Sequence, residues 1–379
     1  MQMSTEQRAG WLYADMEIVE KEDALLSPEE RMAEAVEPLL FWFQKNARIL
    51  PWREEPTPYH VWISEIMLQQ TRVEAVKDYY RRFLEALPDI QALAQVPEER
   101  LLKLWEGLGY YNRARNLKKA AEETVNRYGG ELPASYEELL SLPGIGSYTA
   151  GAIASIAFGI PVPAVDGNVL RVTARLMADT DDILKQSVKR RTEALLQKIM
   201  PRDEAGAFNQ ALMEIGALVC VPNGAPHCSR CPLEGLCLAC RYGKTDVIPV
   251  KTPKKARIIE ERTIFAVVRG SEVLLHKRPE KGLLAGLYEL PGASGYLTEQ
   301  EALDFLGLEE KDAVVLEKLP EARHIFSHVE WRMQGYYISL RDEAQTKDGF
   351  FAERETAREA YALPGAFRAY AAYLFDRKS

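Results

Sequence analysis

Residues 141–169 read SLPGIGSYTAGAIASIAFGIPVPAVDGNV, and this stretch decides the fold. Its opening, Leu142–Gly146, predicts a tight turn between two helices, because two glycines let the chain bend sharply and approach a ligand. The small and apolar residues from Tyr148 to Ala157 predict a compact helix after the turn. The first N–H groups of a helix have no partner within it, so this helix start can bind a phosphate group. Two prolines end the helix, and the carboxylate of Asp166 follows in an apolar, turn-prone setting.

The composition indicates a soluble globular protein of two or three domains. The chain has 379 residues, of which 47% are hydrophobic and 27% are charged. It contains no run of about 18 apolar residues, the length that a membrane span requires. Its acidic start lacks the apolar segment of a signal peptide. We therefore expect a cytoplasmic protein that does not bind a membrane.

The net charge of −8 does not exclude nucleic-acid binding, because the excess of acidic residues is local. Eight acidic and two basic residues within positions 1–30 contribute −6, which leaves −2 for residues 31–379. DNA affinity follows local Lys and Arg contacts and not the total charge.

The sequence pattern divides the chain into four parts. Residues 1–28 predict an acidic extension, in which positions 11–18 suggest a short helix. Residues 29–242 have helical periodicity and few strand-like stretches, which predicts an all-α domain. The polar residues 243–256, with their prolines and lysines, predict a linker. Residues 257–379 mix strand and helix patterns, which predicts an α+β domain.

The same patterns predict individual elements. A helix is expected from the N-cap Ser27 to about Lys45, and a loop is expected over 50–58. Residues 59–86 predict two helices joined at the polar residues 68–71. Further helices are predicted at about 98–106, 113–128, 135–141, 147–158, 166–177, 187–200, 204–219, 298–306 and 364–376. Strands are predicted at 262–268, 272–277 and 332–339.

The five cysteines are clustered in the order Cys220-x7-Cys228-x2-Cys231-x5-Cys237, with Cys240 close behind. A cytosolic chain has no reason to gather thiols for disulfides, so the clustering indicates metal ligation. Four thiolates in one short loop suit a [4Fe–4S] cluster or a tetrahedral zinc ion. The spacing alone does not choose between these two.

Glu65 lies within the apolar sequence VWISEIMLQQT at residues 61–71. Helical spacing places it near the stripe formed by Val61 and Leu68. A carboxyl group in such surroundings has a raised pKa and can act as a general acid. The competing interpretation is a Glu at the edge of the core that is paired with an Arg.

Residues 105–115, WEGLGYYNRAR, combine two glycines, two adjacent tyrosines and two arginines. This combination predicts a turn that presents aromatic rings to bases and cations to phosphates. The competing interpretation is an aromatic turn within the core.

Together with LPWR at residues 50–53, these motifs resemble the helix-hairpin-helix DNA glycosylases, and most closely the MutY-type adenine DNA glycosylases of the endonuclease III superfamily. The resemblance implies that the turn at Gly144 and Gly146 holds DNA phosphate. It also implies that Glu65 protonates the departing adenine and that Asp166 is the catalytic anion beside the sugar. This pair follows the two-carboxylate logic of glycoside hydrolysis, and it acts on a base flipped out of the stack.

The resemblance assigns further roles around these carboxylates. Asn168 and Tyr148 would orient Asp166. Relatives that also cut the strand carry a Lys at the position of Tyr148, and a Tyr cannot form their Schiff base. We therefore expect a monofunctional enzyme that removes the base only. Contacts with the adenine or the DNA are assigned to Trp52, Arg53, Leu68, Gln70, Thr71, Tyr110 and Gln210.

The cysteine loop resembles the iron–sulfur loop of the same superfamily, which implies a [4Fe–4S] cofactor. The implied ligands are Cys220, Cys228, Cys231 and Cys237. The first gap has seven residues here and six in the family, so either Cys220 or Cys240 can complete the set, and we favour Cys220. Such a cluster has no open coordination position, which suits a structural or DNA-sensing role.

The second half resembles a Nudix domain at GLYELPG, residues 286–292. The following ASGYLTEQEALDFLGL lacks the acidic pairs of a Nudix box, which implies a domain without pyrophosphatase activity. The segment from His324 onward resembles the loop by which MutY proteins read 8-oxoguanine, and it assigns that role to Phe326, Ser327 and His328. The competing interpretation of this segment is a solvated β-turn.

The resemblance implies double-stranded DNA with 8-oxoguanine:adenine or guanine:adenine mispairs as the partner of a monomer associated with the bacterial nucleoid. Three other functions are considered. A bifunctional glycosylase/lyase is disfavoured by Tyr148, and an active Nudix hydrolase fused to a DNA-binding module is disfavoured by the missing acidic box. A DNA-damage sensor without catalysis is disfavoured by the presence of both Glu65 and Asp166.

Overall fold

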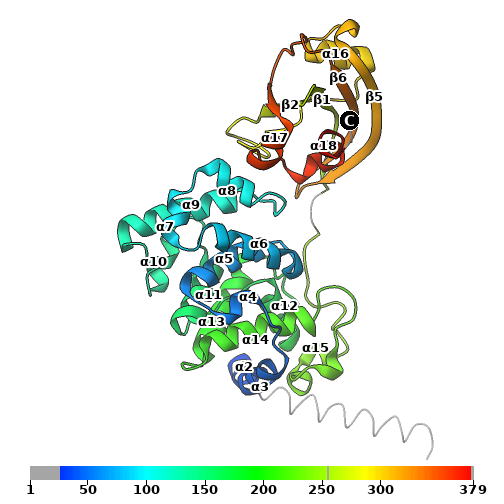
Figure 1. The fold of residues 1–379 in the computed structure, drawn as a ribbon. Helices are drawn as coiled ribbons and strands as arrows, with labels where there is room; N and C mark the ends of the chain where they lie inside the picture. The colour runs from blue at the N-terminus through cyan, green and yellow to red at the C-terminus, as the bar shows by residue number, and fades with distance from the viewer. Residues whose placement is uncertain (1–25, 254–255, 377–379) are drawn as a thin grey trace, which may run out of the picture. The chain divides into compact units, whose positions relative to one another are not determined.

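The protein, described here by a computed structural model over residues 26–253 and 256–376, forms two compact units (Figure 1). The described residues of the first unit are 26–66 and 132–252, and those of the second are 67–131, 253 and 256–376. The helix expected at 11–18 lies outside the described residues. None of the helices that the structure describes has the length and apolar character needed to cross a membrane.

In its described residues the first unit is helical. Its α-helices are α2 (Pro28–Glu34), α3 (Val36–Asn46), α4 (Pro51–Glu54), α5 (Pro58–Leu68), α10 (Tyr136–Leu140), α11 (Ser147–Phe158), α12 (Gly167–Leu176), α13 (Gln186–Ile199), α14 (Ala205–Leu218) and α15 (Leu238–Arg241). Two short 3-10 turns, η1 (Cys228–Arg230) and η2 (Glu234–Leu236), precede α15. The apolar faces of α3, α12 and α14 meet in a core where Leu39, Val169 and Phe208 are completely buried.

The turn between α10 and α11 has the conformation that the sequence predicts. Gly144 has a φ of +77°, a left-handed conformation that an L side chain rarely adopts. Gly146 is the N-cap residue of α11 and has no side chain to cap the helix. A Cβ at Gly146 would meet no protein atom within 4 Å. The first N–H groups of α11 have no partner within the helix, and the helix begins at a residue without a side chain, the kind of position at which a phosphate can bind.

The second unit begins with helices α6 (Val73–Ala86), α7 (Ile90–Gln95), α8 (Glu98–Leu104) and α9 (Asn112–Tyr128). Helices α7 and α9 pack against each other, and α8 contacts α6 and α9. The buried rings of Phe83 and Trp105 pack edge to face, with their centroids 5.9 Å apart. This packing supports the turn between α8 and α9, which carries Tyr110.

The rest of the second unit is a mixed sheet covered by helices on both faces. Its strands are β1 (Ile258–Arg269), β2 (Glu272–Lys277), β3 (Tyr288–Glu289), β4 (Gly292–Ser294), β5 (Ala313–Ile325), β6 (Val329–Leu340) and β7 (Phe350–Glu353). The order is β3-β2-β1-β6-β5, with β4 paired to β1 and β7 paired to β2. Strands β1 and β6 run parallel, and the other pairs are antiparallel.

Two cores hold the helices on this sheet. One face packs against η4 (Gly365–Phe367) and α18 (Arg368–Phe375), and α17 (Arg354–Ala360) joins this core. The other face packs against α16 (Glu299–Leu306), which is followed by the short turn η3 (Glu310–Asp312). The predicted fold class, an all-α domain followed by an α+β Nudix-like domain, is confirmed. The domain boundaries drawn from the sequence stay a prediction.

Several local predictions were wrong for identifiable reasons. The helix expected from Ser27 to Lys45 is interrupted at Ala35, because Pro38 has no N–H and its ring would collide with the preceding turn. The expected loop over 50–58 contains α4, which begins at Pro51, a residue suited to the first helical position. The sequence reading also missed α7 and β5. Strand β5 lies at an edge of the sheet and is mostly exposed, and its sequence AVVLEKLPEARHI does not alternate regularly between apolar and polar residues.

Candidate active site

Glu65 lies on α5, where its carboxyl group is buried with only 6% of the residue exposed. The phenolic hydroxyl of Tyr148, from the start of α11, donates a short hydrogen bond to Glu65 Oε2. Burial raises the pKa of Glu65 to about 7, the Tyr148 hydrogen bond lowers it, and the negative charge of Asp166 raises it further. The predicted rise in the pKa of Glu65 is confirmed, and at neutral pH the carboxyl group can both hold and release a proton.

Asp166 is the N-cap residue of α12. Its Oδ1 accepts hydrogen bonds from the backbone N–H groups of Asn168 at 2.9 Å and Val169 at 2.8 Å. Its Oδ2 accepts a bond from the Asn168 side-chain amide at 2.6 Å. Burial raises the pKa of Asp166, whereas these donors and the positive charge of Arg171 lower it. The net effect is a raised pKa for Asp166, and the donors fix the orientation of its carboxyl group at a helix N-terminus.

Tyr148 joins the two carboxyl groups in one site. Burial raises its pKa well above the usual value, and the charges of Glu65 and Asp166 raise it further, so the phenol remains a neutral donor. The expected contact between Asn168 and Asp166 is present. Tyr148, however, donates to Glu65 and not to Asp166, because its hydroxyl faces the α5 carboxyl group. The structure thus gives Tyr148 a different partner from the one expected.

Arg171, which the sequence reading missed, connects the Asp166 site to the cysteine loop. Its guanidinium donates to Asn168 Oδ1 and to the carbonyl of Gly216, each at 2.8 Å. It also donates to the carbonyl of Cys220 at 2.7 Å. Asn168 therefore accepts from Arg171 while it donates to Asp166, which fixes the orientation of its amide. Arg171 had no sequence signal beyond its position five residues after Asp166 on the same helix.

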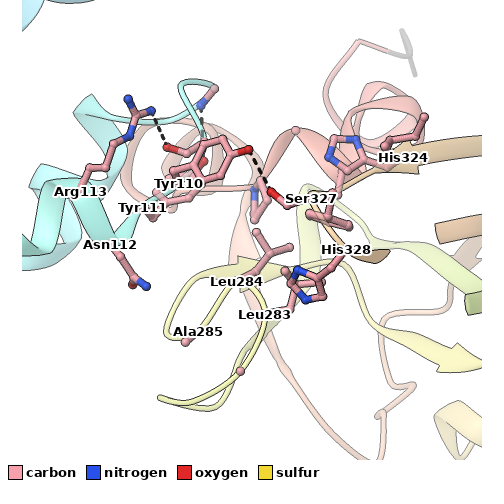
Figure 2. Close-up of a pocket in the computed structure, with 18 of the residues that line it drawn as sticks. Tyr110, Tyr111, Asn112, Arg113, Leu283, Leu284, Ala285, His324, Ser327 and His328 are labelled. Carbon is pink, nitrogen blue, oxygen red and sulfur yellow. Dashed lines mark hydrogen bonds between the residues drawn. The ribbon is translucent and has the colours of Figure 1, made fainter. Parts of the chain in front are cut away.

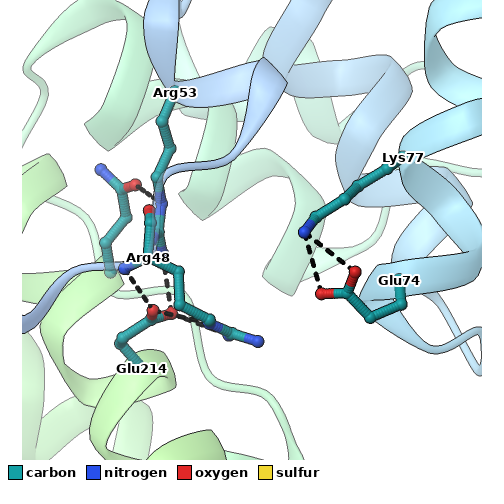
Figure 3. Close-up of polar contacts among 6 residues, drawn as sticks. Arg48, Arg53, Glu74, Lys77 and Glu214 are labelled. Carbon is teal, nitrogen blue, oxygen red and sulfur yellow. Dashed lines mark hydrogen bonds and ion pairs between the residues drawn. The ribbon is translucent and has the colours of Figure 1, made fainter.

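The predicted adenine contacts Arg53 and Gln210 touch each other, with Arg53 Nε donating to Gln210 Oε1 at 2.9 Å. Arg53 also forms a salt bridge of 3.0 Å with Glu214, whose other oxygen binds Arg48 at 2.7 Å (Figure 3). Burial opposes the charge of Glu214, but the hydrogen bonds from both arginines lower its pKa to about 2. Trp52, the residue before Arg53 on α4, is buried. The positive charge of Arg53 slightly opposes the rise of the Glu65 pKa, and Arg53 itself is paired with Glu214.

Glu214 was also missed by the sequence reading. It stands within the apolar run of α14 and is 1% exposed. A charge in such a run needs a partner, and this signal could have pointed to an arginine from another segment.

Two of the predicted DNA contacts, Gln70 and Tyr110, occupy strained backbone positions in the second unit. Gln70, after α5, has a φ of +59°, and Tyr110, before α9, has a φ of +49°. Such values are uncommon outside glycine and gather at functional sites, where the surrounding structure holds them. Arg113 supplies that support, because it donates to the carbonyls of Gln69 at 2.5 Å and Gly109 at 3.0 Å. Both exposed side chains are therefore presented from loops tied to one guanidinium.

Two further predicted DNA contacts, Leu68 and Thr71, flank Gln70. Leu68 is the last residue of α5 and is half-buried. The hydroxyl of Thr71 accepts a long hydrogen bond of 3.4 Å from Arg113. The sequence motif WEGLGYYNRAR predicted that Arg113 presents its charge to a phosphate, whereas its guanidinium donates to backbone carbonyls within the unit.

The predicted 8-oxoguanine loop, Phe326–His328, forms the tight turn between β5 and β6. The N–H of Phe326 donates to the carbonyl of Val329 at 2.8 Å, and the Phe326 ring packs on Trp331 with centroids 4.9 Å apart. Ser327 is exposed, and its hydroxyl lies 3.1 Å from the hydroxyl of Tyr110 (Figure 2). The loop borders a cavity of about 710 Å³ within the second unit. Other residues that line the cavity include Asn112, Leu284, His324 and Gly365.

The cysteine side chains converge on one cavity in the first unit. Its lining includes Cys220, Cys228, Cys231, Cys237 and Cys240. Arg175 donates to the Cys220 sulfur at 3.2 Å, and the buried Arg31 anchors the loop through a 2.9 Å bond to the carbonyl of Leu236. Over residues 26–253 and 256–376, no three His, Cys, Asp or Glu side chains gather tightly enough to hold a single metal ion. The five thiols are not paired in disulfides.

Comparison with known proteins gives two family matches. Residues 63–200 match the family model described as HhH-GPD superfamily base excision DNA repair protein. Residues 263–373 match the model of the NUDIX domain.

Individual relatives extend these matches over most of the chain. The adenine DNA glycosylase of Mus musculus is 37% identical over 361 residues, which cover 80% of this chain and 70% of the relative. The adenine DNA glycosylase of Homo sapiens is 37% identical over 369 residues, which cover 81% of this chain and 67% of the relative. Among solved structures, a thermostable thymine-DNA glycosylase is 29% identical with a TM-score of 0.51, covering 56% of this chain and 97% of its own.

Proposed function

Since the chain belongs to the adenine DNA glycosylase family, whose members are hydrolases of N-glycosyl bonds in base excision repair, we propose that it releases adenine mispaired with 8-oxoguanine or guanine. One observation carries the proposal. Tyr148 is hydrogen-bonded to Glu65 and lies within electrostatic range of Asp166; the Glu65 carboxyl group is poised to give a proton, while hydrogen bonds and the charge of Arg171 favour the ionised form of Asp166.

The reaction needs both groups at once. After the adenine is flipped out of the duplex, Glu65 gives its proton to the leaving base as the bond to the sugar breaks. The bonding electron pair leaves with the base, and the sugar becomes an oxocarbenium ion. The Asp166 carboxylate stabilises that cation, and water adds to the sugar carbon and loses a proton. The products are free adenine and an abasic site.

Arg53 and Gln210 would recognise the flipped adenine beside Trp52. Their mutual hydrogen bond fixes the Gln210 amide, and Glu214 fixes the guanidinium. Because the donors and acceptors of this site are already oriented, little conformational entropy is lost when adenine binds. The site can therefore distinguish adenine by the hydrogen-bonding groups on the edge of the base.

The enzyme would be monofunctional. The residue next to Glu65 in the site is Tyr148, whose phenol provides no amine to form a Schiff base with the sugar. Borohydride trapping on DNA with an abasic site tests this point. A covalent complex would contradict it and support the glycosylase/lyase alternative.

The cysteine loop fits a [4Fe–4S] cluster. Four thiolates among Cys220, Cys228, Cys231, Cys237 and Cys240 would each bind one iron, and Cys220 remains our first choice over Cys240. The arginine N–H on the Cys220 sulfur is the kind of second contact that such thiolates receive. When bound, the cluster would hold the loop that supports Arg171. The visible absorption spectrum, with iron and zinc analysis, separates a cluster from a zinc ion.

Double-stranded DNA is the partner that the family implies. We assign its contacts to the turn at Gly144 and Gly146, to Leu68, Gln70, Thr71 and Tyr110, and to the Phe326–His328 loop. The loop would read 8-oxoguanine, for which the exposed Ser327 hydroxyl is a suitable hydrogen-bonding group. The proposal includes a monomer that acts in the cytoplasm.

One experiment tests the proposed function. Single-turnover base release is measured on duplexes in which adenine stands opposite 8-oxoguanine, guanine, cytosine or thymine. We expect the fastest release opposite 8-oxoguanine, slower release opposite guanine, and an uncut strand. Equal rates on all four duplexes would contradict the mispair specificity.

A further inference from the structure

The turn that carries Tyr110 and the loop that carries Ser327 belong to the same compact unit, although 217 residues separate them in the chain. Their hydroxyl groups point toward each other in Figure 2 and lie 3.1 Å apart. A single hydrogen bond between exposed hydroxyls contributes too little to keep two loops in register. The neighbouring contacts show what does.

Glu106, four residues before Tyr110, accepts a 2.6 Å hydrogen bond from the backbone N–H of Leu363. Its second oxygen forms a 2.7 Å salt bridge with Lys103, which also donates to the carbonyl of Tyr361 at 3.1 Å. Glu106 and Lys103 thus bind the backbone N–H of Leu363 and the backbone carbonyl of Tyr361, in the segment that leads to η4. Hydrogen bonds with one charged partner are stronger than neutral ones.

Arg115, five residues after Tyr110, holds a second loop. Its Nη2 donates to the carbonyl of Ala285 at 2.7 Å, and its Nε forms a 2.7 Å salt bridge with Glu98. A Cβ added at the adjacent Gly286, which has a φ of +64°, would lie 3.1 Å from this guanidinium. Only glycine suits that position, because it combines a left-handed backbone with a close approach.

A packed path leads from these contacts to Ser327. The segment held by Glu106 continues into η4, whose Phe367 ring lies 5.8 Å from that of Trp331. The Trp331 ring in turn packs on Phe326, the residue before Ser327. Residues of η4 and of the Ala285 loop line the same cavity as Tyr110 and Ser327. Movement of the segment held by Glu106 would therefore displace the serine, and movement of the Ala285 loop would change the cavity that the serine borders.

We propose that Glu106 and Arg115 are positioning residues for recognition of the base opposite the adenine. They fix the Tyr110 turn to the segment before η4 and to the Ala285 loop of the Nudix-like part. Tyr110 and Ser327 would then contact the DNA with a fixed relative position. The inference rests on the proposed function and extends it to residues that touch no base.

The test compares Glu106→Ala, Glu106→Gln and Arg115→Ala in the full-length protein. The quantity measured is the ratio of single-turnover rates with adenine opposite 8-oxoguanine and opposite guanine. We expect both alanine variants to lower this ratio by about fivefold or more, the size that a lost charge-assisted hydrogen bond supports, with the rate opposite guanine unchanged. Glu106→Gln keeps an acceptor for the Leu363 N–H and should retain most of the ratio.

Glu122→Ala is the matched control, because Glu122 is paired with Lys118 within α9 and the exchange removes the same charge. Amide hydrogen exchange gives a second readout, since Leu363 should lose protection in Glu106→Ala and keep it in the control. A wild-type protein without preference for 8-oxoguanine would contradict the proposed function and, with it, this inference. A wild-type preference that survives unchanged in both alanine variants would contradict the inference alone.

Discussion

The catalytic carboxyl groups proposed in the first unit and the DNA-recognition residues proposed in the second unit, Tyr110 and Ser327, lie in opposite kinds of surroundings. Glu65 is buried, and burial is the main cause of its raised pKa. Tyr110, in contrast, is 47% exposed. Its unusual feature is its backbone conformation, with a φ of +49°. Proton transfer benefits from a dry site, because removal of water shifts the pKa toward neutrality. Recognition of DNA needs side chains that project, and a strained loop held by Arg113 keeps them in position.

The largest expected effect concerns the anion of the first unit. Asp166→Asn should lower single-turnover adenine release by at least about 10⁴-fold, because the oxocarbenium ion loses its counter-charge. Asparagine is an equally good N-cap, so α12 and the affinity for mispaired DNA should be preserved. Asp89→Asn makes the same exchange at the N-cap of α7 and should leave the rate unchanged. Retained turnover in Asp166→Asn would remove Asp166 from the chemistry.

The next effect concerns the acid. Glu65→Gln keeps an acceptor for the Tyr148 hydroxyl but has no proton to give, so release at neutral pH should fall by about 10²–10³-fold. Glu85→Gln, on the exposed face of α6, serves as the control. If Glu65→Gln releases adenine at the wild-type rate, another group must supply the proton.

The same substitution should change stability in a way that depends on pH. The pKa of Glu65 is raised from its usual 4.5 to about 7, so its favourable contribution to folding is complete below pH 4.5 and is lost as pH rises through 7. Glu65→Gln does not ionise. Its free energy of unfolding should therefore rise relative to wild type by about 2 kcal/mol between roughly pH 5.5 and pH 8.5. Thermal melts of both proteins across this range provide the measurement, and parallel curves would mean that the carboxyl group titrates as if exposed.

The smallest expected effect lies in the second unit. Ser327→Ala should lower the ratio of rates opposite 8-oxoguanine and opposite guanine by about three- to tenfold, the loss expected for one hydrogen bond. Adenine release opposite guanine should not change, because the catalytic carboxyl groups are untouched. Ser294→Ala, another exposed serine of the Nudix-like part, is the control. An unchanged ratio would assign the discrimination to other residues.

The same contrast explains what the sequence could predict. Glu65 was singled out because a charged residue in an apolar helical stripe is a local signal, and the family resemblance gave it the role of the acid over a core Glu paired with an Arg. The structure agrees with the expected rise of its pKa. The hairpin turn at Gly144 was equally local, since glycine is suited to its backbone conformation. The partners of Glu214 could not be predicted, because Arg48 and Arg53 lie more than 160 residues away in the chain.

Contacts to backbone atoms were also invisible in the sequence. Arg113 and Glu106 act through carbonyl and N–H groups, which every residue carries, so no residue pattern marks their partners. The orientation of Tyr148 toward Glu65 depends on how α5 and α11 pack, which helical periodicity alone does not give. Edge strand β5 was missed because its exposed faces need no apolar alternation.

The pH dependence of single-turnover adenine release, for wild type and Glu65→Gln side by side, tests the central claim most directly. Wild type should lose activity as pH rises above about 7, where Glu65 gives up its proton, and this limb should be absent in the much slower Glu65→Gln variant. A basic limb that persists in Glu65→Gln, or a wild-type rate that stays flat through pH 7, would contradict proton donation by Glu65.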